Sequence, residues 1–147
     1  MMFMKEPQKR TLFPRAAGIL SIAASLITIY VSAMLIHGVL LTWEFTHAYY
    51  YDWRILGVSF FYYLATGVFG VISFFFGLTS GIFASERKRI KFSLLGLSLL
   101  ITCGVMIFLS FFILGSSILL VSIFGLPILV PSVLSIIFVA KSKAEFN

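Results

Sequence analysis

Three long stretches of the chain contain no Asp, Glu, Lys or Arg, and the charged residues collect between them and at the two ends. The stretches cover 16–41, 55–85 and 92–140, with 26, 31 and 49 residues. A helix crosses the hydrocarbon core of a bilayer, about 30 Å thick, with about 20 residues. The third stretch would form a helix of about 73 Å, more than two crossings. The pattern therefore predicts four transmembrane helices, with the chain doubling back inside the third stretch.

The turn in the third stretch is predicted at its midpoint, at Gly115, Ser116 and Ser117. Small residues that tolerate turns reverse the chain there without placing a charge in lipid. This places the third helix at 92–114 and the fourth at 118–140.

The alternative is a turn at 124–127, where Gly125 and Pro127 also disfavour a helix. It would leave only 13 residues before Lys141, fewer than the roughly 17 that a crossing needs. We therefore expect Pro127 and Pro131 to kink the fourth helix, with the freed carbonyls bonded by neighbouring helices or serines.

Composition supports the same fold class. Hydrophobic residues make up 61% of the 147 positions, charged residues 11%, and the mean hydropathy is +1.10. Soluble domains have roughly 45–50% apolar and 25% charged residues. The sequence thus predicts an all-α polytopic membrane protein, a single domain over 1–147 in which four helices form an up-and-down bundle. The helices are expected at 16–41, 55–85, 92–114 and 118–140, with loops at 42–54 and 86–91.

The basic residues predict the orientation. Ten of the eleven Lys and Arg lie before the first helix, between the second and third, or after the fourth. By the positive-inside rule these segments are cytoplasmic, so both termini face the cytoplasm and the loop 42–54 lies outside. The residues expected to set this topology in the cell membrane are Arg15, Arg87, Lys88, Arg89, Lys91 and Lys141.

The same distribution accounts for the net charge of +6. Nothing in the sequence forms a folded domain that would shape a basic patch for nucleic acid, so no nucleic-acid partner is predicted. Each Lys or Arg near an anionic bilayer surface contributes roughly 1 kcal/mol of attraction to its head groups. The predicted partner is the lipid bilayer.

Small residues recur along the first two helices. In lipid, helices associate by close backbone approach, so small residues four apart mark contact faces. We expect the two helices to pack tightly inside the bundle. The alternative use of these faces is contact with other membrane subunits or with a second copy. The predicted packing residues are Ala17, Ser21 and Ser25 in the first helix and Gly70, Gly77 and Gly81 in the second.

The loop 42–54 is rich in aromatic residues. Rings that are apolar in body and polar at one edge collect at the head-group level of a bilayer. The loop is therefore predicted to carry an interfacial aromatic belt formed by Trp43, Tyr49, Tyr50, Tyr51 and Trp53.

A metal or haem site near this loop is the sharper alternative. His37, Glu44, His47 and Asp52 are suitable ligand types for zinc, copper or non-haem iron. Their spacing matches none of HxxxH, HxxE or HExxH, and His37 lies close enough to the outer end to reach interfacial water. We therefore predict that the protein holds no cofactor.

Catalytic and transport chemistry is missing from the predicted membrane segments. None of them contains Asp, Glu, Lys or Arg, the residues that compensate charge along an ion path. No nucleophile with a base, metal cluster or carboxylate pair is recognisable. The single cysteine, Cys103, is expected to be a packing residue.

The predicted function is accordingly that of a non-enzymatic multi-pass membrane protein, a structural, accessory or assembly subunit acting through helix contacts. One alternative is a small channel or transport component formed by an oligomer. Another is a metal-binding or haem-binding membrane protein that uses the outer loop.

Two stretches carry a resemblance to known proteins: ASERKRIKFSLLGLSLL at 84–100 and FGLPILVPSVLSIIFVAKSKAEFN at 124–147. With their basic turn, Gly/Leu-rich hairpin and short Lys/Glu/Phe tail, they resemble small four-helix integral membrane proteins of archaea and bacteria, families that are largely uncharacterised. The resemblance implies a four-helix topology and a prokaryotic cell membrane, and it implies no activity.

Overall fold

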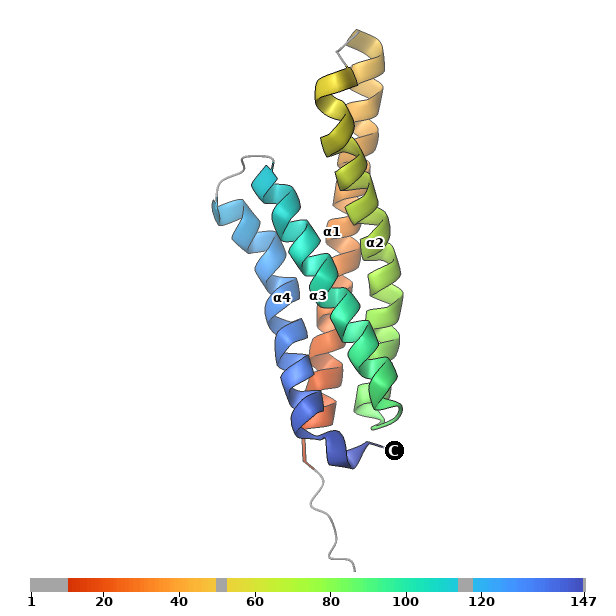
Figure 1. The fold of residues 1–147 in the computed structure, drawn as a ribbon, viewed down its shortest axis with the longest axis vertical. Helices are drawn as coiled ribbons and strands as arrows, with labels where there is room; N and C mark the ends of the chain where they lie inside the picture. Colours follow the sequence, from red (N-terminus) through yellow and green to blue (C-terminus); the bar gives the residue numbers. More distant parts are fainter. Residues whose placement is uncertain (1–10, 50–52, 114–117, 147) are drawn as a thin grey trace, which may run out of the picture.

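The computed structural model of the chain describes residues 11–49, 53–113 and 118–146, and the side chains of 11–44, 60–110 and 123–146. This part forms α1 (Phe13–Tyr49), α2 (Trp53–Ser85), α3 (Ile90–Ile113), α4 (Ile118–Lys141) and the 3₁₀ turn η1 (Lys143–Glu145). The helices lie side by side, and η1 crosses one end (Figure 1). Four helices in this part are long and apolar enough to span a membrane, in agreement with the number that the sequence predicts.

The last two helices begin and end within two residues of the predicted positions, 92–114 and 118–140. The predicted turn at 115–117 lies outside the described residues. Helix α4 continues through Pro127 and Pro131, so the chain makes no turn at 124–127.

The first two helices are longer than predicted. Helix α1 continues to Tyr49 and α2 begins at Trp53, so most of the segment 42–54 is helical and the prediction of a loop there is wrong. The segment contains no Gly or Pro to end a helix. The Thr42 hydroxyl donates to the Gly38 carbonyl at 2.8 Å. The Trp43 and Phe60 rings contact each other at a tilt of 37°, with their centroids 5.5 Å apart, and join the two helices. The polar residues of the segment 42–54 therefore mark the edge of the apolar span rather than the end of a helix.

The extra length makes one end of the bundle uneven. Helix α1 has 37 residues and α3 has 24, a difference of about 20 Å at 1.5 Å per residue. Figure 1 shows the paired ends of α1 and α2 extending well past the ends of α3 and α4. We call this part, residues 42–49 and 53–60, the projecting hairpin.

Buried positions recur at alternating spacings of three and four residues in every helix. This is the spacing of helices that cross at about 20° with ridges interlocked in grooves. Many of the buried residues are small, which lets the helices approach closely. The buried positions with this alternating spacing are Ala17, Ser21, Ala24, Thr28 and Val31 in α1; Thr66, Gly70, Ser73, Gly77, Ser80 and Ala84 in α2; Ser93, Gly96, Leu100, Cys103, Ile107 and Ser110 in α3; and Gly125, Ile128, Ser132, Ser135 and Val139 in α4.

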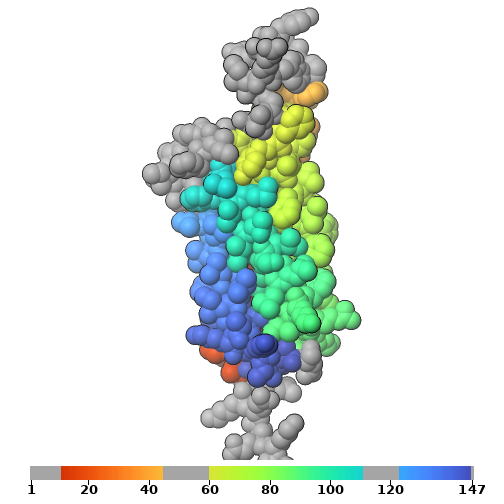
Figure 2. All heavy atoms as spheres, viewed as in Figure 1, coloured from red at the N-terminus to blue at the C-terminus, as the bar shows by residue number. Residues whose placement is uncertain are grey.

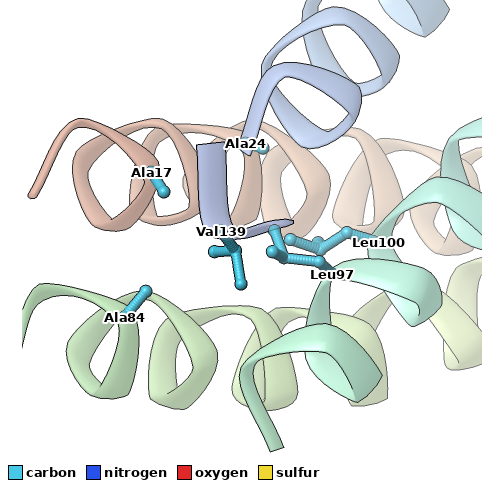
Figure 3. Close-up of a cluster of buried hydrophobic side chains, with 6 residues drawn as sticks. All are labelled: Ala17, Ala24, Ala84, Leu97, Leu100 and Val139. Carbon is cyan, nitrogen blue, oxygen red and sulfur yellow. The ribbon is translucent and has the colours of Figure 1, made fainter. Parts of the chain in front are cut away.

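Larger apolar residues of α3 and α4 fill the space that the small residues leave. Figure 3 shows one such cluster, in which Leu97, Leu100 and Val139 lie between the helices that carry Ala17, Ala24 and Ala84. A second cluster contains Val31, Cys103, Ile107 and Ile128. Two phenylalanines of α2, Phe61 and Phe75, point outward instead and are 68% and 62% exposed. The visible face of the molecule is a continuous surface of α2, α3 and α4 (Figure 2).

Candidate functional site

The backbones of α1 and α2 approach each other closely at the basic end of the bundle. A Cβ atom built on Gly18 would lie 2.6 Å from the Gly81 carbonyl oxygen, and one built on Gly81 would lie 2.9 Å from the Gly18 carbonyl oxygen. Real Cβ atoms do not approach backbone atoms so closely, so the two backbones are in direct contact. Further along, Ser21 Oγ donates to the Gly77 carbonyl at 2.9 Å. We call this contact the α1–α2 seam.

The glycines of α2 continue the seam toward α3. A Cβ on Gly77 would overlap Ser25 Oγ and lie 2.7 Å from Leu100 Cδ1, and a Cβ on Gly70 would overlap Ser32 Oγ. The structure thus brings the six predicted packing residues into the bundle interior, where all are buried. They are Ala17, Ser21, Ser25, Gly70, Gly77 and Gly81.

Other contacts in the interior are made by residues that were not predicted to pack. Ser80 Oγ donates to the Ser93 carbonyl at 2.7 Å and joins α2 to α3, while Ser135 Oγ donates to the Ala17 carbonyl at 3.1 Å and joins α4 to α1. Gly18 was also missed. Ser80 and Ser93 both fall at the alternating spacing of three and four residues between small positions, so a search for that spacing would have identified them.

Two tyrosines fasten the other end of α2 to α3. The Tyr62 hydroxyl donates to the Met106 carbonyl at 3.2 Å, and the Tyr63 hydroxyl donates to the Ser110 carbonyl at 3.0 Å. A tyrosine ring is apolar in its body and polar at its hydroxyl, so it is suited to lie near a membrane surface. They mark the level at which α3 ends and the projecting hairpin begins.

An ion-pair cluster lies at the basic end of the bundle. Arg87 Nε lies 3.2 Å from Glu145 Oε2, in an ion pair without hydrogen-bond geometry, and an Arg87 terminal nitrogen donates to the Thr11 carbonyl at 2.9 Å. The Thr11 backbone N–H donates to the Glu145 carboxylate at 3.2 Å, and the Thr11 hydroxyl also donates to it. The Arg87 and Glu145 side chains are only 18% and 11% exposed. We call Thr11, Arg87 and Glu145 the Arg87–Glu145 cluster.

This cluster joins the segment before α1, the turn between α2 and α3, and η1. Arg87 has a positive φ of 58°, part of the tight turn that aims it there. The sequence predicted that these three segments share one face, but not that they touch. The other basic residues predicted to set the topology, Arg15, Lys88, Arg89, Lys91 and Lys141, are exposed.

The residues proposed as metal ligands do not form a site in the part of the chain with described side chains. His37 and Glu44 are exposed on α1 and seven residues apart, about 10 Å along the helix axis. No three His, Cys, Asp or Glu side chains come together within the described residues. His47 belongs to α1, but its side chain, like residue Asp52, lies outside the description.

The predicted aromatic belt is described only in part. Trp43 is exposed on α1, and its ring contacts the Phe60 ring. Tyr49 ends α1 and Trp53 begins α2, but their side chains are not described, and Tyr50 and Tyr51 lie outside the described residues.

Comparison with known proteins finds no significant match to this chain among family models, curated proteins or solved structures.

Replacement of Gly18 by Ala is expected to destabilise the bundle by about 1–3 kcal/mol, because the new methyl group meets the Gly81 carbonyl and the helices must move apart. The matched control is Gly38→Ala, in the same helix, where an added Cβ meets nothing within 4 Å. The control should leave stability unchanged or raise it by up to about 1 kcal/mol, since Ala favours helix over Gly. Unfolding of both variants in detergent measures the difference, and equal stabilities would contradict the seam.

Replacement of Glu145 by Gln is expected to lower stability by about 1–3 kcal/mol, because Arg87 is left largely buried without its counter-charge. Glu86→Gln is the control, since its pair with Lys88 is exposed and contributes roughly 0–1 kcal/mol. The measurement is the free energy of unfolding at low and high salt. A larger loss in the Glu86 variant would show that the cluster does not hold this end together.

Proposed function

We propose that the chain is a non-enzymatic multi-pass protein of the cell membrane and acts as a structural, accessory or assembly subunit. Its helices form an up-and-down bundle, with both termini and the α2–α3 turn in the cytoplasm. The projecting hairpin, on the outer side, is the part that meets a partner.

The Arg87–Glu145 cluster supports the shared location of the termini and the turn. Its hydrogen bonds and ion pair hold Thr11, Arg87 and Glu145 together at one end of the helices. Three segments in contact at one end of a membrane bundle lie on one side of the membrane. Their excess of Lys and Arg supports the cytoplasm as that side.

The close packing of the interior is the observation that carries the proposed function. The buried polar side chains in the described residues are all Ser or Thr. Several of them donate to helix carbonyls, either four residues back in the same helix or across a helix contact. The glycine contacts fill the space between the backbones. A bundle closed in this way is suited to hold a shape rather than to conduct or react.

The small-residue faces are used inside the chain, so a partner needs another surface. Helix α1 is about 55 Å long, whereas a bilayer with its head groups is about 40–45 Å thick. The projecting hairpin therefore reaches past the head groups, and Glu44 is exposed on it. Extramembrane contact with a partner subunit is best placed there.

The topology predicts opposite locations for reporter enzymes fused at Ala48 and at Lys88. A reporter active only in the cytoplasm should work at Lys88 and fail at Ala48, and a reporter active only outside should give the reverse. The same location for both positions would contradict the proposed topology.

The assembly role predicts a partner that co-purifies from the native membrane in mild detergent at a fixed ratio. A photoreactive residue at Glu44 should cross-link to that partner, because this position lies on the projecting hairpin. The control is the same residue at Val130, which is 51% exposed on the apolar outer face of α4 and should meet lipid. A protein recovered alone, without a cross-link from Glu44, would overturn the proposal.

A further inference from the structure

A groove with a cavity volume of about 510 Å³ lies at the start of α3. It is lined by Arg89, Ile90, Lys91, Phe92 and Leu95, so two cations stand beside an apolar wall. The Phe92 ring packs against the Phe83 ring at 5.3 Å and the Phe76 ring at 6.1 Å between centroids. The wall is thus held by α2, while Leu95 remains 47% exposed.

The basic residues at 87–91 differ in whether they are paired with an acid. Arg87 is paired with Glu145, and Lys88 is paired with Glu86 at 3.0 Å. Arg89 and Lys91 are exposed, and the Arg89 guanidinium lies 5.8 Å from the centre of the Phe83 ring. Both acids of this end that have described side chains are therefore engaged by Arg87 and Lys88, which leaves the two cations at the groove for another anion.

The position of the groove indicates what that anion belongs to. It lies where the charged turn gives way to the apolar span of α3, the level of lipid head groups in an inserted bundle. A soluble phosphate would use the cations and leave the apolar wall wet. A neutral lipid would cover the wall and leave the cations unused. An anionic phospholipid matches both, since Arg and Lys bind phosphate and an acyl chain covers Phe92 and Leu95.

We propose that this groove binds one anionic phospholipid, with the phosphate between Arg89 and Lys91 and an acyl chain along Phe92 and Leu95. The assignment rests on the proposed insertion in the membrane, and it does not depend on a partner subunit. It makes the start of α3 a defined lipid site rather than part of a general basic surface.

The test measures lipid binding to the purified full chain in an uncharged detergent, by native mass spectrometry and by the shift in melting temperature. The probes are phosphatidylglycerol and phosphatidylcholine with the same acyl chains. The variant is Arg89→Asn with Lys91→Gln, because Arg89 has a positive φ of 47°, which Asn tolerates better than most residues. The control is Lys141→Gln with Lys143→Gln, which removes the same charge from exposed positions at the same end.

Wild-type protein and the control variant should prefer phosphatidylglycerol by about tenfold or more, and the groove variant should lose about that factor, at roughly 1 kcal/mol for each cation. Equal losses in the two variants would indicate a diffuse basic surface and would overturn the site. Equal binding of the two lipids to the wild type would also overturn it.

A second variant tests the acyl-chain wall without changing charge. Leu95→Trp should fill the groove and weaken phosphatidylglycerol binding severalfold, and glycerol phosphate without acyl chains should not compete with the lipid. Effective competition by glycerol phosphate, or unchanged lipid binding in Leu95→Trp, would overturn the proposal, even if the charge variant proved unstable. Because no partner is present in the assay, the absence of a co-purified subunit would leave the result unaffected.

Discussion

Contact between backbones at the α1–α2 seam is the constraint on which the bundle depends. In a bilayer, burial of apolar side chains between helices gains little over burial in lipid, so packing and hydrogen bonds have to hold the helices together. Both require close approach, and Gly18 and Gly81 allow it. The hydroxyl of Ser21 reaches the Gly77 carbonyl only because the helices are already this close. The larger Leu97 and Leu100 can then fill the space beside the seam.

The two ends of the bundle are held in different ways, and this difference underlies the proposed function. At the basic end, the Arg87–Glu145 cluster ties segments from the beginning, middle and end of the chain. At the other end, the Tyr62 and Tyr63 hydroxyls bond to carbonyls of α3, and α1 and α2 continue as a pair. One end is therefore closed by contacts within the chain. At the other end, α1 and α2 extend past the described ends of α3 and α4 (Figure 1).

The number of helices and the limits of α3 and α4 could be predicted because they depend on how long a chain can remain uncharged in lipid. The limits of α1 and α2 could not, because charge marks the membrane surface and a helix passes through that surface without interruption. The Arg87–Glu145 pair was also beyond the sequence, since the two residues are 58 positions apart and each lies among other charges. Gly18 was missed because the small residues of the first helix were followed at intervals of four from Ala17, whereas Gly18 precedes Ser21 by three.

The inward direction of the small residues limits how the chain can meet other proteins. A GxxxG pair such as Gly77 and Gly81 on an isolated helix would favour association with another helix. Here the same pair is covered by α1, and Leu100 of α3 lies against Gly77, so a second copy could use it only if the bundle opened. The outward faces of the helices carry large side chains such as Phe61 and Phe75, which suit contact with acyl chains. The sites that we propose for recognition of other molecules accordingly lie at the two ends, for head groups at the start of α3 and for a partner at the projecting hairpin.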